Sequence, residues 1–246
     1  MLPTLEGIIA RRVLLNFRAD PQVVQRLVPA PLEVATVNGA AIVGICLIRL
    51  EQLRPKGVPA DFGLSSENMA HRVALRHPSD GVFIWRRETD LALAMFLGGR
   101  LFPGVHHCAK FYVAQDAGSL EMEVHTRKSE ADVRFRAKVV NEWTATPAFA
   151  TFDDARTFFQ RGDCGYSCAL REGKLEGMQL RTLRWEMTPL VVEDVNANFY
   201  GDTERFPRGS VEFDGALLMR GIPHEWHELR DVPELAEVAE CSEAHG

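Results

Sequence analysis

The sequence predicts an α+β fold, in which a large, curved antiparallel β-sheet or barrel carries a few short helices. Segments rich in β-forming residues outnumber helical segments by about nine to about four. Strands and helices do not alternate as they do in the βαβ units of a parallel sheet. No internal repeat or low-complexity block divides the chain, so we expect a single domain at residues 1–230 and a flexible acidic tail at residues 231–246.

The first elements follow from local signals. Residues 7–18 are rich in β-forming residues and predict a strand. Asp20 and Pro21 suit the N-cap and the first position of a short helix. An Asn-Gly turn then precedes a nearly continuous apolar run at residues 41–50, which is typical of a strand that is buried on both faces.

The middle of the chain contains signals for two further strands, at residues 67–76 and 82–87. Thr89 or Asp90 suits the N-cap of a helix over residues 91–97, and a Gly-Gly pair ends that helix. Apolar and polar residues alternate in the strand that follows, so its consecutive side chains point to opposite faces of the sheet.

Two successive strands then carry charges of opposite sign. Glu121 and Glu123 alternate with apolar residues on one strand, and Arg134, Arg136 and Lys138 do so on the next. Acidic residues opposite basic ones predict an antiparallel pair with complementary charges across the strands. The pattern therefore indicates a solvated sheet face rather than a binding surface.

The last part of the chain predicts a helix at residues 153–160, strands at 162–170 and 177–187, a helix at 188–199 and a strand at 211–219. The second of these helices rests on a Thr-Pro start, which suits an N-cap followed by the first helical position. Its apolar residues also recur at helical spacing.

Composition and charge narrow the class of protein. The chain is 46% hydrophobic and 25% charged, which is typical of a globular protein. The net charge of −6 and the scattered basic residues argue against a nucleic-acid partner. No apolar run reaches the roughly 18 residues of a membrane helix. Five cysteines without a recognisable signal peptide predict a reducing cytoplasm.

The motifs of common cofactor and metal sites are absent from the sequence. It contains no glycine-rich phosphate loop, no paired CxxC, no HExxH and no GxSxG, so we expect no cofactor. His106 and His107 are adjacent on a strand, so they point to opposite faces and do not readily chelate one metal ion. Glu67, His71 and His107 form an alternative metal-binding set, but the prediction is that no metal is bound.

Two features point to an organic acid as ligand or substrate. Arg11 and Arg12 lie on the first strand, and a guanidinium group can bind a carboxylate through two parallel hydrogen bonds; alternatively, both meet surface acids. Lys110 lies in an apolar strand context. A buried lysine with a lowered pKa can form a Schiff base with a carbonyl compound, whereas an exposed one would simply lie on the solvated face.

The order of these motifs resembles a known group of proteins. Residues 11–34 resemble the amino-terminal strand, helix and VPxPLE turn of acetoacetate decarboxylases, and residues 89–109 resemble their next helix and the segment with the catalytic lysine pair. The resemblance is closer still to the YqjF-like family of uncharacterised bacterial proteins allied to that fold. The shared segments are Arg100-Leu-Phe102, Glu67-Asn68 and the FxxR run at Phe158-Phe-Gln-Arg161.

The resemblance covers the chain from about residue 8 to about residue 225 and implies an acetoacetate decarboxylase-like fold with a small-molecule pocket. It also implies a homo-oligomer. In the decarboxylases, one lysine forms the Schiff base and its neighbour lowers its pKa. The lysine pair falls at His106 and His107, or at His107 and Cys108, and therefore has no lysine here.

Other active-site residues of the family are partly kept. The family's arginine falls on or next to Arg11, and one of its two glutamates falls near Glu67; the other falls on a glycine and is absent. Histidine forms no stable imine with a ketone. The resemblance therefore implies the position of an active site without its Schiff-base chemistry.

Three functions are compatible with these residues. In an enzyme with lyase, isomerase or hydratase chemistry on a small oxo acid, His107 or His106 would act as general acid and base. Arg11 would then bind the acid and Glu67 would share a proton. Alternatively, the same pocket belongs to a non-catalytic small-molecule binding protein; a decarboxylase that uses a displaced Lys110 is the third alternative. The candidate ligand contacts are Arg12, His71, Cys108 and Met95.

Overall fold

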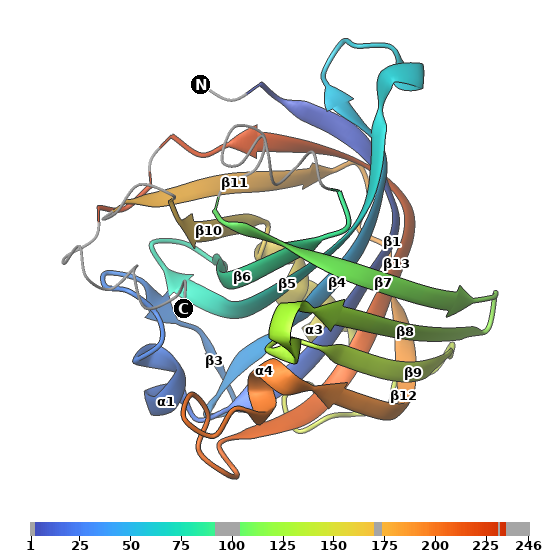
Figure 1. Cartoon of the computed structure of the whole chain (residues 1–246). Helices are drawn as coiled ribbons and strands as arrows, with labels where there is room; N and C mark the ends of the chain where they lie inside the picture. Colours follow the sequence, from blue (N-terminus) through green and yellow to red (C-terminus); the bar gives the residue numbers. More distant parts are fainter. Residues whose placement is uncertain (1–2, 92–103, 170–173, 231, 235–246) are drawn as a thin grey trace.

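The computed structural model describes residues 3–91, 104–169, 174–230 and 232–234, and this part of the chain is mostly β-sheet (Figure 1). The helical elements are α1 (Pro21–Gln25), α3 (Phe152–Arg161), α4 (Asn198–Gly201) and the 3₁₀ turns η1 (Ala60–Phe62) and η2 (Arg127–Ser129). The strands are β1 (Leu5–Ala19), β2 (Glu33–Val34), β3 (Thr36–Val37), β4 (Ala40–Pro55), β5 (Leu64–His77), β6 (Gly81–Thr89), β7 (His106–Gln115), β8 (Ser119–Thr126), β9 (Val133–Val139), β10 (Cys164–Cys168), β11 (Leu175–Thr182), β12 (Thr188–Ala197) and β13 (Val211–Glu228).

The strands close into two rings that share a wall. Nine strands in the order β6-β7-β8-β9-β12-β13-β1-β4-β5 form a closed barrel, the large ring, because β5 also pairs with β6. Strand β10 pairs with β6 and with β11, and β11 pairs with β13. These two strands therefore close a small ring over the shared wall of β13, β1, β4, β5 and β6. Strand β10 pairs with the start of β6, whereas β7 pairs with its end.

Both faces of the shared wall are buried because each face lines a different ring. On β1, Val13 and Leu15 belong to the core of the large ring, whereas Leu14 packs on the other face with Leu50 and Leu180. A strand with two buried faces needs apolar residues at consecutive positions. This explains the continuous apolar run of β4 and confirms the prediction made from it.

The predicted start of the chain is also confirmed. The carboxylate of Asp20 accepts hydrogen bonds from the backbone N–H groups of Gln22 and Val23, and Pro21 opens α1. Asn38 and Gly39 have φ angles of 49° and 82°, the left-handed conformation that a tight hairpin turn requires between β3 and β4.

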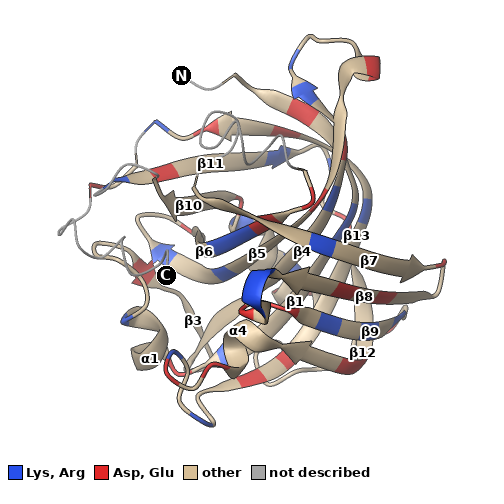
Figure 2. Ribbon diagram, viewed as in Figure 1, with Lys and Arg blue, Asp and Glu red and all other residues tan. Residues whose placement is uncertain are grey.

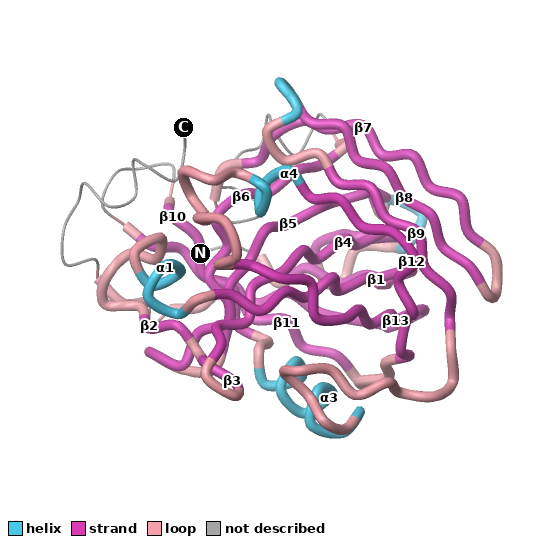
Figure 3. Tube along the Cα trace, turned by 90° about the horizontal axis from the view of Figure 1, so that it is seen from below, coloured by secondary structure: helices cyan, strands magenta, loops and turns pink. Residues whose placement is uncertain are grey.

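Helix α3 confirms the prediction for residues 153–160 and packs on the face of the shared wall that lines the small ring. The Thr151 side chain accepts a hydrogen bond from the N–H of Asp154 and so caps the helix. Phe159 packs against Leu14 of β1 and Leu180 of β11, in the core on the outer face of the shared wall. Figure 3 shows α3 outside the strands, beside β11 and β13.

The alternating charges lie where the sequence predicts them. Strands β8 and β9 are antiparallel, with Glu121 opposite Arg136 and Glu123 opposite Arg134. The described ion pairs of these arginines go to the other neighbour, β12, where Arg134 lies 3.3 Å from Asp194. Figure 2 shows the resulting acidic, basic and acidic bands across β8, β9 and β12.

The predicted helix at residues 188–199 is wrong. Residues 188–197 form strand β12, and the one-turn helix α4 follows. β12 pairs with β9 and β13 and thereby closes the large ring, so tertiary pairing outweighs the Thr-Pro start. Residues 92–97 of the predicted helix lie outside the described residues, as does most of the predicted tail. Within the tail, Val232 packs against the core and Glu234 forms a β-bridge with Lys174. None of the described helices has the length and apolar character to cross a membrane.

Candidate functional site: a cavity in the small ring

A cavity of about 110 Å³, the ring cavity, lies inside the small ring. Strands of the shared wall, β10 and β11 supply its lining, and His106 borders it from the start of β7. Its apolar lining includes Ile48, Leu50, Val82, Ile84, Met178 and Leu180. Pockets for drug-sized molecules are larger, so a cavity of this size suits a small metabolite.

Three arginines from strands of the shared wall border this cavity: Arg12 of β1, Arg72 of β5 and Arg87 of β6. Each of these arginines donates a hydrogen bond to an uncharged side chain. Arg12 Nε donates to Cys46 Sγ at 3.3 Å, Arg72 Nη2 to Asn16 Oδ1 at 2.8 Å, and Arg87 Nη2 to Ser167 Oγ at 2.9 Å.

These arginines keep buried donors without a partner. Arg12 Nη1, Arg72 Nε and Arg87 Nε are buried and make no hydrogen bond. None of the three forms an ion pair with a carboxylate in the described part of the chain. Burial lowers the pKa of both Arg72 and Arg87 to about 10, so both remain cationic at neutral pH. A buried charge without a counter-charge costs free energy, which an anionic ligand would offset.

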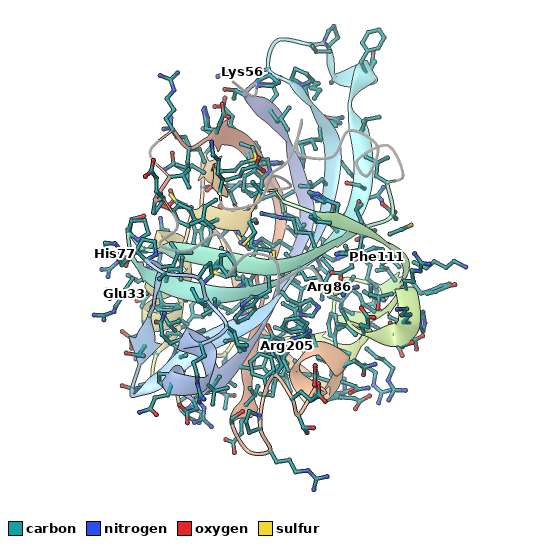
Figure 4. The ribbon with its side chains drawn as sticks, turned by 60° about the vertical axis from the view of Figure 1, so that its left-hand side comes forward. Glu33, Lys56, His77, Arg86, Phe111 and Arg205 are labelled. Atoms are coloured by element: carbon teal, nitrogen blue, oxygen red, sulfur yellow. The ribbon has the colours of Figure 1, made fainter. Side chains whose placement is uncertain are left out.

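Two carboxylates also border the cavity, Asp163 and Glu88. Asp163 accepts a hydrogen bond from Gln179 Nε2 at 3.0 Å. Glu88 is fully buried and pairs with Arg86, which also binds Glu130 at 2.9 Å. Figure 4 shows Arg86 in the interior of the molecule. The charge that faces the ring cavity is therefore mainly positive.

Two titratable groups of the cavity, His106 and Glu88, could exchange protons with a ligand, and burial raises the pKa of Glu88 to about 7. Burial, and next the positive charge of Arg87, lower the pKa of His106 to about 3. Its imidazole is therefore neutral at pH 7 and has a lone pair that can accept a proton.

The structure separates Arg11 and Glu67 from this cavity. Arg11 Nη2 lies 2.6 Å from Glu67 Oε2, and the two side chains are 4% and 11% exposed. Arg11 also donates to Gln115 of β7, so the pair belongs to the large ring. Burial raises the pKa of Glu67 against the opposing effect of Arg11. The side chains of Arg11 and Arg12, which are consecutive on β1, therefore lie on opposite faces of the shared wall.

The remaining candidates lie apart from one another. His107 borders a different, much smaller cavity of about 10 Å³ beside Ser167, as expected for a neighbour of His106 on a strand. His71 is fully buried and stacks on Phe199 with ring centroids 4.3 Å apart. Cys108 and Lys110 are exposed on the outer face of β7. Met95 lies outside the described residues. Among those residues, no three His, Cys, Asp or Glu side chains form a metal-binding group.

Arg72 and Arg87 are not among the site residues that the sequence predicts. Arg72 directly precedes the buried residues 73–75 and alternates with Val73, which places it on the outer face of the wall. Arg87 follows an apolar run at residues 82–85 and reaches the same face because the pairing of β5 with β6 shifts register beyond Ile84. An arginine inside a strand that is buried on both faces is the signal that could have found them.

The fold is acetoacetate decarboxylase-like. An acetoacetate decarboxylase-like enzyme from Sphingomonas wittichii RW1 superposes with a TM-score of 0.58 at 15% identity, over 93% of each chain. The acetoacetate decarboxylase of Legionella pneumophila gives 0.61 at 11% identity, over 95% of this chain and 86% of that one. The enduracididine biosynthesis enzyme MppR complexed with pyruvate gives 0.56 at 12% identity, over 95% and 90%.

Within this class, the chain belongs to DUF2071, a family described as an uncharacterized conserved protein, whose model matches residues 9–208. This confirms the resemblance to the YqjF-like proteins. A search of curated proteins finds no match.

Proposed function

We propose that the protein binds a small organic acid in the ring cavity, with its carboxylate held by Arg12, Arg72 and Arg87. The observation that carries the proposal is that three guanidinium groups with unpaired buried donors border one cavity. Carboxylates accept such donors in strong, charge-assisted hydrogen bonds. The structural similarity to MppR complexed with pyruvate supports an oxo acid as the ligand.

Isothermal titration calorimetry with matched acids and neutral analogues tests this proposal. Pyruvate and acetoacetate are expected to bind, whereas methyl pyruvate and acetone are expected to bind at least about tenfold more weakly, because they lack the negative charge. Tight binding of the neutral compounds, or no binding of any small acid, would contradict it.

A proton-transfer reaction on the bound acid is the second candidate function, and the position of His106 at the cavity favours it. The neutral imidazole would remove a proton from the carbon next to the carbonyl, and the arginines would stabilise the enolate. This is the first step of the isomerase, hydratase or lyase reactions that an oxo acid can undergo. Without such a step, the protein would be a binding protein only.

Deuterium exchange into the methyl group of pyruvate, followed by NMR, separates these candidates. We expect exchange above background that is lost in His106→Gln. Because the pKa of His106 is lowered to about 3, the base stays unprotonated and the rate should not fall between pH 7 and pH 5. A rate that halves near the ordinary histidine value of 6.5, or a fully active His106→Gln variant, would rule out this assignment.

The lysines give no support to Schiff-base chemistry. The five lysines of the sequence are Lys56, Lys110, Lys128, Lys138 and Lys174, and all are exposed. Figure 4 shows one of them, Lys56, at the edge of the molecule. An exposed lysine lacks the burial that lowers its pKa in imine-forming enzymes. The proposed chemistry therefore uses no covalent adduct with a lysine.

A further inference from the structure

A second, larger cavity of about 260 Å³, the outer cavity, adjoins the ring cavity. It lies between β1, the β2–β3 segment, β5, the start of β6 and helix α3. Four residues line both cavities: Arg12, Arg72, Val82 and Gly162. Two of the arginines that face the proposed acid site therefore also form the boundary to the outer cavity.

Arg72 is fixed at this boundary. It is 4% exposed, donates to Asn16, and has its guanidinium carbon 5.3 Å from the ring centre of Phe159, which lines the outer cavity. Its Nε remains a buried donor without a partner. The boundary between the two cavities therefore contains a fixed cation, the guanidinium group of Arg72.

The outer cavity adds cations of its own. Arg76 of β5 and Arg161 of α3 line it, together with one acid, Asp80. Arg76 is already paired with Glu33 at 2.7 Å. Arg161 forms no ion pair with any carboxylate that the structure describes. Arg161 is therefore the residue of the outer cavity that is best able to bind an anion.

We infer that the ligand carries two anionic groups and occupies both cavities, as a dicarboxylate does. One carboxylate lies in the ring cavity at Arg72 and Arg87, and the second lies in the outer cavity at Arg161. The linking carbon chain crosses the boundary beside Val82 and Gly162, which carry no charge. This inference rests on the proposed acid site and adds to it the class of acid.

Isothermal titration calorimetry tests the inference by comparing the affinities of two series of acids with the same chain lengths. The first series is the dicarboxylates from glutarate to suberate, and the second is the monocarboxylates from pentanoate to octanoate. At least one dicarboxylate is expected to bind about tenfold more tightly than the monocarboxylate of equal length. Arg161→Gln should abolish this preference and leave the affinity for monocarboxylates unchanged. Arg156→Gln is the matched control, because Arg156 lies on the same helix, pairs with Asp153 and borders neither cavity.

The outcomes separate this inference from the proposed function. Monocarboxylates that bind without any preference for a second carboxylate would overturn the inference and leave the acid site standing. A preference that persists in Arg161→Gln would also overturn it. If neither kind of acid binds, both the inference and the proposed function fail. Loss of the preference in Arg161→Gln but not in Arg156→Gln supports both.

Discussion

Replacing Arg72 with methionine is expected to weaken the binding of a small organic acid by roughly tenfold to a hundredfold. The variant loses one charge-assisted hydrogen-bonding partner of the carboxylate, which contributes about 1.5–3 kcal/mol. It also removes a buried cation that has no counter-charge among the described residues, which favours the folded state, but it leaves the buried Asn16 Oδ1 without its donor, which costs about 1–3 kcal/mol. Because these two contributions oppose each other, the free energy of unfolding should change little. Calorimetry and urea unfolding of the same variant measure the two effects.

The matched control for this experiment is Arg134→Met. Arg134 lies on the solvated face of β9, 58% exposed and paired with Asp194, so its removal should change neither the affinity nor the stability appreciably. An Arg72→Met protein that is folded and binds acids as tightly as the wild type would refute the proposed site.

Replacing Glu67 with leucine is expected to destabilise the protein by about 3–5 kcal/mol, because Arg11 is then buried without its partner. The double variant Arg11→Met with Glu67→Leu should recover most of the lost stability, since two apolar side chains replace the ion pair together. Urea unfolding of the wild type, both single variants and the double variant measures this as a double-mutant cycle.

The same variants test which face of the wall binds the ligand. The folded double variant should retain wild-type affinity for small acids, because the pair belongs to the large ring. Loss of affinity there would move the site to Arg11 and Glu67, as the family resemblance implies. A single Glu67→Leu variant as stable as the wild type would contradict the role given to the ion pair.

Local signals predict much of this fold. The cap at Asp20, the Asn-Gly turn and the alternation in β8 and β9 each depend on residues close together in the sequence, and each is confirmed. The error at residues 188–199 has the opposite origin. A strand that closes a barrel is stabilised by distant partners, here β9 and β13, which a local pattern does not contain.

The site was predictable only in part for the same reason. The sequence indicates that His106 and His107 point to opposite faces, and it draws attention to Arg12. It does not show that β10 and β11 enclose a second ring, so it cannot tell which face of the wall carries the cavity. Arg72 and Arg87 acquire their importance only from that closure.

The shared wall also affects how relatives of this protein should be aligned. Arg11 and Arg12 are consecutive, yet one contributes to a structural ion pair and the other borders the cavity. The pairing of β1 with β4 shifts register between Ile9 and Arg11, as a β-bulge does. At 11–15% identity, an alignment that slips by one residue here would assign a binding arginine to a structural position. Functional residues are therefore better transferred between such proteins by which ring a side chain enters than by its place in the sequence.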